Sequence, residues 1–357
     1  MTRRIPVWLS FSVVVGLVGC QGPGIVLPSG SHPEDFKVLR SGAAEMLITG
    51  TWERGEPAGQ LERLRLNQDT AFSVITDSAD PALKGFRPVG LSVVPRSTAP
   101  GWRGKTLIYA VTAGTKTMPS GVLVFEWTGQ QAQYLATLRP QSGGILPRLN
   151  AVTALPNGIV FVTAFRPLSR AAAAAPAWQP LPAGKAPPGD SLLRFLPDAT
   201  AAAGLGSWAV CSGGWGGANG IGISADHRLL LVAGFHKKRI HGLPLDAATG
   251  SLDFAKKSTL QLRGHPDNLT PLAGGHWLAC TVPSRLGSGV RLIAEERLPL
   301  RTPYLLARCH AEEFSLQPLR RVSRTPLPRR ISQPSTVWRD GASFYTSRVR
   351  QAGLVRW

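Results

Sequence analysis

The sequence has few of the residues that build the commoner kinds of reactive site. Its 357 residues contain only four cysteines, Cys20, Cys211, Cys280 and Cys309. No two of them have the spacing of a zinc site or of a thioredoxin-like redox pair. Outside the cytoplasm the last three allow one disulfide at most, and isolated cysteines in a large domain are more typically buried packing residues. Cysteine spacing therefore gives no support to zinc or dithiol chemistry.

Sequence motifs of several large enzyme classes are absent as well. The chain has no Gly-x-Ser-x-Gly elbow, no His-Glu-x-x-His pair, no phosphate-binding loop and no dinucleotide fingerprint. It also lacks an amphipathic stretch long enough for a helix of about twelve residues. The glycine cluster at 213–217 is interpreted as a flexible approach to a strand near Asn219. These absences leave little support for α/β-hydrolase, zinc-protease, nucleotide-hydrolase or dehydrogenase function.

Acidic residues are scarce relative to basic ones. The chain has 21 Asp and Glu against 40 Lys and Arg, which gives a formal net charge of +19. Nucleic acid is a common partner for such a charge, but an exported chain rarely meets it, and the arginines are scattered. Attraction to phosphate-bearing lipid is a better explanation, and a generic solvated surface is commoner than either. We predict no nucleic-acid partner.

The N-terminus has the pattern of an export signal. A basic start is followed by the mostly apolar run Ile5–Val18, which is too short to span a bilayer comfortably. The run ends in Leu17-Val18-Gly19-Cys20, which resembles a bacterial lipobox; an ordinary signal peptide with a chance cysteine is the alternative. Gln21, rather than Asp, follows the cysteine and favours the outer membrane. We predict a signal peptide at 1–19, lipid on Cys20, a tether at 20–32 and a location in the bacterial cell envelope, facing the periplasm or the cell surface.

The rest of the chain, residues 33–357, has the pattern of one all-β domain. Short apolar runs rich in β-branched and aromatic residues alternate with turn residues. Five segments look alike, because each begins with small or polar residues and runs directly into an apolar strand: 86–93, 149–155, 218–224, 266–272 and 334–338. With Glu34-Asp35 they make six starts, which is typical of the blades of a β-propeller. A β-sandwich with coincidental spacing is the alternative.

One segment does not fit this pattern. Residues 167–190 are rich in alanine and proline, and alternation of these two residues cannot form a packed strand. We interpret the segment as a loop insertion.

Polar residues recur at the predicted strand starts. In a propeller the innermost strands run along the central channel, so groups at their starts converge at one end of the axis. The starts carry Glu34, Asp35, Asn150, Asn219, Asp267 and Asn268. Carboxylate and amide oxygens without thiolate or imidazole suit Ca²⁺. A single Asn or Asp at a strand start more often caps its own turn, but recurrence at matched positions favours a metal site.

Seven segments resemble, in order, the motifs of the paraoxonase/arylesterase family, which belongs to the gluconolactonase-like superfamily. The resemblance covers roughly residues 33–357 apart from the insertions. It rests on residues 33–39, 87–92, 146–152, 218–224, 236–241, 266–269 and 333–337. It implies a six-bladed β-propeller that hydrolyses lactones and aryl esters with a central calcium ion. The ligands would be Glu34, Asn150, Asn219, Asp267 and Asn268. A second, structural calcium would use Asp35 and the backbone near Leu91, but Ala151 stands where the family has an acid.

Other positions depart from the family pattern. Val89 and Ala113 stand where the family has its catalytic histidines, and Arg356 stands where it has a ring-closing cysteine. Metal-bound carboxylates, Glu34 or Asp267, remain to activate water. Three other histidines, at 236, 241 and 265, are expected on outer strands or loops, at the surface.

Two functions follow from this pattern. The first is calcium-dependent hydrolysis of lactones or aryl esters, in which water attacks a carbonyl polarised by the metal. The second is a lipid-anchored propeller that keeps calcium and binds a partner without turnover. The intact ligand set favours the enzyme, and the loss of both histidines favours the binding module.

Overall fold

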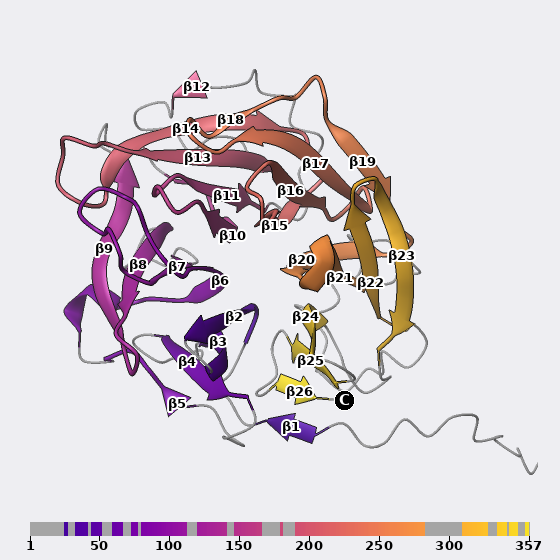
Figure 1. The fold of residues 1–357 in the computed structure, drawn as a ribbon, viewed down its shortest axis with the longest axis horizontal. Coiled ribbons are helices and arrows are strands. Elements are labelled where there is room, and N and C mark those ends of the chain that lie inside the picture. The colour runs from indigo at the N-terminus through magenta and orange to yellow at the C-terminus, as the bar shows by residue number, and fades with distance from the viewer. Residues whose placement is uncertain are drawn as a thin grey trace, which may run out of the picture.

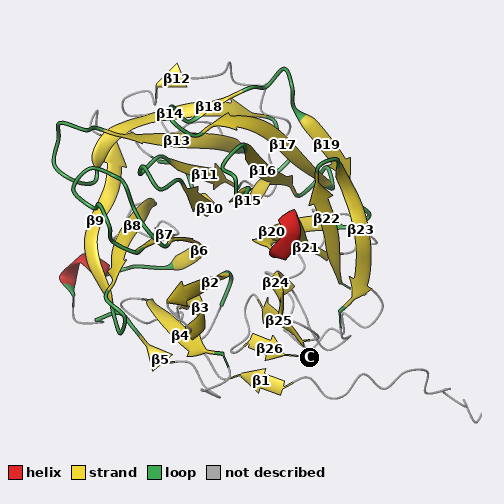
Figure 2. Cartoon of the chain, in the orientation of Figure 1, coloured by secondary structure: helices red, strands yellow, loops and turns green. Residues whose placement is uncertain are grey.

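Strands make up nearly all of the regular structure of the described chain (Figure 2). The computed structural model describes residues 25–27, 33–41, 44–51, 59–66, 73–77, 80–112, 120–140, 146–165, 179–180, 190–282, 309–327, 334–340, 343–348 and 354–356. Within them, helix is limited to two single turns, Pro81–Leu83 and Ala273–Gly275. The prediction of an all-β fold is confirmed. In these residues no helix has the length and hydrophobicity needed to cross a membrane.

The strands form a ring of sheets around a central axis, which is a β-propeller (Figure 1). Two sheets have four consecutive strands each: β2 (Phe36–Ser41), β3 (Ala44–Thr51), β4 (Gln60–Arg65) and β5 (Ser73–Val74); and β20 (His265–Pro271), β21 (His276–Val282), β22 (His310–Leu316) and β23 (Leu319–Pro326). A third contains β15 (Ala218–Ile223), β16 (Leu229–Gly234), β17 (Arg239–Asp246), β18 (Ser251–Leu252) and β19 (Ser258–Gln261).

The largest sheet has nine strands and joins two consecutive units of the chain. Its first unit is β6 (Pro88–Val94), β7 (Leu107–Thr112), β8 (Gly121–Trp127) and β9 (Ala132–Pro140). Its second unit is β10 (Leu149–Ala154), β11 (Val160–Ala164), β12 (Gln179–Pro180), β13 (Ser191–Pro197) and β14 (Leu205–Gly213). They are joined because the start of β14 pairs in parallel with the end of β9, at Leu205↔Arg139 and Gly206↔Pro140.

The prediction of six blades is corrected, because the described strands form five sheets. The ends of β9 and β14 pair with each other, so two consecutive units of the chain share one sheet. Each unit still contributes one inner strand to the axis, and these inner strands are β2, β6, β10, β15, β20 and β24 (Figure 1).

The hydrophobic core lies between neighbouring units of the ring. One cluster packs Leu39, Ile48 and Leu61 of the β2–β5 sheet against Ile108 and Leu123 of the next unit. Corresponding clusters join each following pair of units, and the last packs Phe36 against Trp338. Because both faces of a strand such as β7 pack against neighbours, all six of its residues are buried. Sheet-to-sheet packing thus fixes the ring around its axis.

The ring closes through segments from opposite ends of the described chain. The remaining sheet contains β24 (Pro334–Asp340), β25 (Ser343–Arg348), β26 (Leu354–Arg356) and β1 (Ile25–Leu27). The antiparallel β1–β26 pairing places the indigo and yellow strands of Figure 1 side by side. Residues 25–27, which were expected to lie in a tether, are therefore part of the propeller. Backbone pairing closes the ring here, and Cys211, Cys280 and Cys309 are all buried, as expected for packing residues.

The predicted loop insertion at 167–190 lies mostly outside the described residues. Within it, Gln179 and Pro180 form β12, which pairs with β14 at its outer edge. A short strand thus occurs in a segment that was expected to hold none.

Candidate functional site

Five of the six inner strands begin with a break in register against the next strand. Such β-bulges turn side chains out of the regular alternation, and they are common next to active sites. The residues inside these breaks are Val89 on β6, Asn150 and Ala151 on β10, Asn219 and Gly220 on β15, Asp267 and Asn268 on β20, and Ser335 and Thr336 on β24. Four of the predicted polar residues, Asn150, Asn219, Asp267 and Asn268, therefore share one local geometry, whereas Glu34 and Asp35 precede β2, which has no such break.

Two glycines allow the inner strands to approach each other closely at these bulges. A Cβ on Gly90 would collide with the backbone oxygen of Asn150, and a Cβ on Gly220 would collide with that of Asp267. Only glycine fits where a neighbouring backbone lies so near. This close approach brings residues from different units of the ring together.

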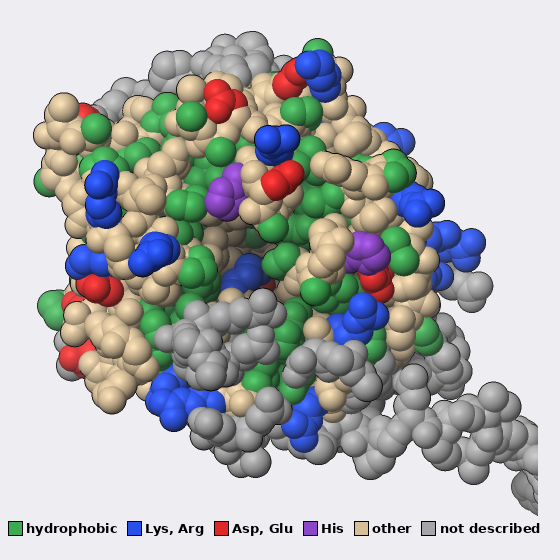
Figure 3. Space-filling model, in the orientation of Figure 1, with side chains coloured by type: hydrophobic (Ala, Val, Ile, Leu, Met, Phe, Trp, Pro, Cys, Tyr) green, Lys and Arg blue, Asp and Glu red, His purple; other side chains and the backbone are tan. Residues whose placement is uncertain are grey.

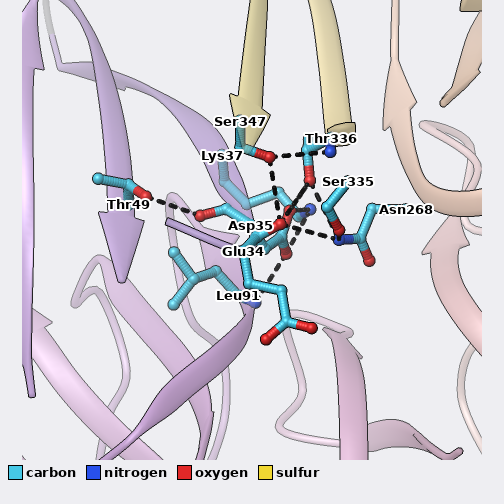
Figure 4. Close-up of polar contacts among 9 residues, drawn as sticks. All are labelled: Glu34, Asp35, Lys37, Thr49, Leu91, Asn268, Ser335, Thr336 and Ser347. Atoms are coloured by element: carbon cyan, nitrogen blue, oxygen red, sulfur yellow. Dashed lines mark hydrogen bonds and ion pairs between the residues drawn. The ribbon is translucent and has the colours of Figure 1, made fainter. Parts of the chain in front are cut away.

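Hydrogen bonds to its backbone carbonyl oxygen hold Glu34 in place. Its carbonyl oxygen accepts hydrogen bonds from Asn268 Nδ2 at 3.3 Å, Thr336 Oγ1 at 3.2 Å and Ser347 Oγ at 3.2 Å. The three donors come from β20, β24 and β25, so they join the first unit of the chain to the last two. In Figure 4 the Glu34 carboxylate points away from this group of donors.

Asp35 is buried beside Glu34 and is surrounded by donors. Its Oδ1 lies 2.7 Å from Lys37 Nζ and accepts from Thr336 Oγ1 at 3.0 Å. Its Oδ2 accepts from Lys37 Nζ at 2.8 Å and from the Leu91 backbone N–H at 2.9 Å. Figure 4 shows all of these partners around the carboxylate. Both oxygens of Asp35 are thus fully engaged within the protein.

The Asp267 carboxylate lies near the Asn219 amide and the Glu34 carboxylate. Burial is the largest cause that raises the pKa of Asp267 well above its ordinary value, and the nearby Glu34 carboxylate is the next. Hydrogen bonds from Ser335 and the Asn219 amide act in the opposite direction. Asn219 is 4% exposed, and its Oδ1 atom is buried without a hydrogen-bond partner. A buried amide oxygen without a partner is costly.

These features fit a bound divalent cation. A divalent cation would partner the buried amide oxygen and offset the repulsion between the two carboxylates. The described residues contain no cluster of three or more His, Cys, Asp or Glu that could hold a metal, so amide oxygens would have to complete the ligand set. The oxygen donors suit calcium rather than zinc.

The remaining predicted site residues have different placements. Asn150 occupies the bulge of β10, between β6 and β15, and is partly exposed. Val89 occupies the bulge of β6 and is 8% exposed. Leu91 donates its backbone N–H to Asp35, and the role of a backbone carbonyl near Leu91 in a second calcium site stays a prediction. Cys20 and Ala113 lie outside the described residues.

Two of the three histidines expected at the surface are buried. His265 opens β20, two residues before Asp267, and its Nδ1 lies 2.8 Å from the Phe235 carbonyl oxygen. His241 lies within β17, where its ring contacts Trp215 and its Nδ1 lies 3.0 Å from Thr259 Oγ1. Burial is the largest cause that lowers the pKa of His241 to about 4, and Lys257, Arg239 and Lys237 lower it further. The surface prediction is wrong for both.

The glycine-rich approach to β15 is held by an aspartate. Asp190 is buried, and its carboxylate accepts from the N–H groups of Gly216, Gly217 and Ala218 at 2.7–2.8 Å. Trp215 is also buried. This approach, expected to be flexible, is therefore anchored directly before Asn219.

The surface view shows where the axis opens. A hollow lies at the centre of the ring in Figure 3, with basic and acidic side chains visible at its floor and hydrophobic side chains around it. Such a hollow gives solvent access to charged groups near the axis.

Solved structures show the same fold with little sequence identity. No protein-family model matches the chain, and no curated protein matches it. It is similar to a luciferin-regenerating enzyme at 14% identity and a TM-score of 0.54, with 94% of each chain covered. It is similar to a candidate gluconolactonase at 14% identity and a TM-score of 0.53, with 95% of this chain and 92% of that chain covered.

A candidate 6-phosphogluconolactonase from Bacteroides fragilis is similar at 12% identity and a TM-score of 0.51, with 89% of this chain and 78% of that chain covered. The structural neighbours thus include gluconolactonase-like β-propellers. The propeller fold that the resemblance implied is confirmed. Its paraoxonase-like part and the lipoprotein assignment stay predictions.

Sequence reasoning missed the partners of the acidic pair. Lys37, Thr336 and Ser347 all contact Glu34 or Asp35, yet none was selected as a site residue. A signal was available for Lys37, because it lies two residues after Asp35 and alternate residues of a strand share a face. No local signal marks Ser347, which reaches the site from the second strand of the last sheet.

Proposed function

We propose that the protein is a calcium-dependent hydrolase of lactones, with aryl esters as a second class of substrate. The observation that carries the proposal is the buried Asn219 Oδ1, which has no hydrogen-bond partner beside the Asp267 carboxylate. Glu34, Asn150, Asn219, Asp267 and Asn268 would hold the ion. Two structural neighbours described as candidate lactonases support the class of substrate.

The roles of the chain's own groups follow from their placement. When bound, calcium would polarise the ester carbonyl and stabilise the oxyanion that forms. Three donors fix the Glu34 backbone, so the Glu34 carboxylate stays directed away from those donors. In our proposal Glu34 or Asp267 accepts the proton of the attacking water. A positioned base contributes a factor of about 10²–10⁴ in rate.

Asn219→Ala tests the proposal, because it removes the unpartnered oxygen. We expect wild-type protein to hydrolyse a member of a lactone panel, to lose that activity with a calcium chelator and to regain it with added calcium. The variant should lose activity about 10²-fold or more, since one metal ligand is missing. Asn157→Ala is the matched control, because that amide lies in a turn and donates to the Ala247 carbonyl oxygen. Equal activity of Asn219→Ala and wild type, or activity that survives chelation, would contradict the proposal.

A binding module without turnover is the second candidate. The observation that favours it is Val89, which is apolar and buried at the bulge of β6, where the resemblance implies a catalytic histidine. Wild-type protein that binds calcium and is inert on every lactone and aryl ester tested would favour this function over hydrolysis.

We also propose that lipid on Cys20 anchors the protein to the outer membrane. The support is the lipobox-like sequence 17–20 and the glutamine that follows it. Fractionation of cells should place wild-type protein with the outer membrane, whereas Cys20→Ser should be absent from the outer-membrane fraction. Equal amounts of both proteins in the outer-membrane fraction would oppose the anchor.

A further inference from the structure

The Asp35 carboxylate has no acceptor site left for a metal ion. A carboxylate offers about four lone-pair positions on its two oxygens. Lys37 Nζ contacts both oxygens, the Leu91 N–H donates to Oδ2, and the Thr336 hydroxyl shares its one proton between Oδ1 and the Glu34 carbonyl oxygen. Each oxygen of Asp35 is therefore contacted by two donor groups of the chain itself. This contrasts with Asn219, whose oxygen has no partner.

Other groups around Asp35 are also unsuited to a second calcium. Leu91 presents an N–H rather than an oxygen to Asp35. Ala151 stands where the resemblance implies an acid; it is 3% exposed, and its methyl side chain offers no oxygen ligand. Calcium needs several oxygen ligands, and carboxylates contribute most to its affinity. One saturated carboxylate with a donor and a methyl group does not provide them.

Asp35 nevertheless needs a positive charge. Its side chain is 2% exposed, and an ionised carboxylate without a partner is costly to bury. Lys37 supplies the charge at 2.7 and 2.8 Å, and its side chain is only 16% exposed. Because Asp35 also contacts Thr336 and Leu91, this charge lies where the first, second and last units of the ring meet.

We infer that the Lys37 ammonium is a built-in cation that takes the place of a second metal ion at Asp35. The chain then needs no dissociable ion to join these three units, and its fold does not depend on calcium at this position. The inference goes beyond the proposed hydrolysis and does not depend on it, because it concerns only the Asp35 position.

Two substitutions at Lys37 separate charge from space. Lys37→Ala removes the ammonium and leaves room for an ion, whereas Lys37→Met removes the charge and fills most of the room. Lys105→Ala is the control, since Lys105 forms a 2.6 Å ion pair with Glu126 that is partly exposed. Thermal unfolding of each protein is measured in a chelator and in calcium, and calcium stoichiometry is measured by titration calorimetry.

We expect both Lys37 variants to lose about 5–10 °C in Tm in the chelator, because a buried charge loses its partner. Calcium should restore none of this loss in either variant, and both should bind as many calcium ions per chain as wild type, because the Leu91 N–H and the Ala151 methyl group leave too few oxygens around Asp35. The Tm of Lys105→Ala should change by no more than about 2 °C.

The inference is overturned if Lys37→Ala loses no more stability than Lys105→Ala. It is also overturned if Lys37→Ala binds an additional calcium ion and regains its Tm in calcium, because the groups around Asp35 would then suit a second metal ion. Should Lys37→Ala not fold, Asp35→Asn combined with Lys37→Met provides the test, because removal of both charges must restore stability relative to Lys37→Met alone. If wild-type protein binds no calcium, the proposed calcium-dependent hydrolysis is wrong. The expected Tm difference between the Lys37 variants and wild type is unaffected by that result.

Discussion

At the scale of single residues, hydrogen-bond partners separate groups that look alike in the sequence. Asp35 and Asn219 both stand at strand starts, and both were predicted as calcium ligands. The structure gives Asp35 a complete set of donors, whereas Asn219 Oδ1 has no partner. The residue types were readable from the sequence, but the partners were not, since Thr336 lies about 300 residues from Asp35. Chemical role here depends on contacts made by tertiary structure.

His241 makes stability depend on pH. Its pKa falls from an ordinary value of 6.5 to about 4, because burial disfavours the charged ring. The unfolded chain therefore binds a proton between these two values and the folded chain does not. The contribution of neutral His241 to the free energy of unfolding is fully present above pH about 6.5 and is lost as pH falls toward 4. It amounts to about 3 kcal/mol.

His241→Gln isolates the effect, because glutamine does not titrate. Urea denaturation at pH about 7 and about 4.5 should show wild type losing roughly 2–3 kcal/mol more than the variant over this range. Equal losses in the two proteins would show that the buried ring is not the cause.

At the scale of elements, strand starts were predictable and their register was not. Small or polar residues followed by apolar runs marked the beginnings of β6, β10, β15, β20 and β24 correctly. The bulges that follow depend on the neighbouring strand as well, and on Gly90 and Gly220, which admit a second backbone. The pairing of β9 with β14 joins the outer edges of two units. The sequence of an outer strand does not indicate which other strand it will pair with.

Asp190 provides a prediction for the approach to β15. Asp190→Asn replaces one acceptor oxygen with a donor that faces backbone N–H groups, so at least one of the three hydrogen bonds is lost. We expect a loss of about 2–3 kcal/mol in the free energy of unfolding, measured by urea denaturation. Asp246→Asn should lose clearly less, because Asp246 is exposed and accepts only from nearby groups, such as the Ala248 N–H, within its own turn. A comparable loss in both would argue against a specific anchoring role.

At the scale of the whole molecule, packing between units decides the architecture. Apolar residues on both faces of the sheets require a neighbour on each side, and closing the ring provides one for every unit. The sequence predicted the propeller from its recurring strand starts, not from this packing. The sequence did not predict that Ile25–Leu27, which precede the predicted domain, would complete the last sheet. A strand of three residues is too short to give a periodic signal.

Ring closure can be tested by changing Ile25, Val26 and Leu27 to proline. Proline removes the N–H groups that pair β1 with β26. We expect a lower Tm and a less cooperative transition by differential scanning calorimetry. Proline at Ser73 and Val74 is the control, since β5 is also an edge strand but does not close the ring. If the proline substitutions in β5 lower the Tm as much as those in β1, ring closure by β1 adds no more stability than any other edge strand.

The parallel pairing of β14 with β9 has a consequence for solubility. Free strand edges are templates on which other chains can add. The rim of this protein would present one such edge per unit, yet the ends of β9 and β14 cover each other, and β12 covers a further part of β14. One arc of the rim is thereby shielded from intermolecular strand addition, and self-association through the rim is directed to the exposed outer strands elsewhere, such as β5.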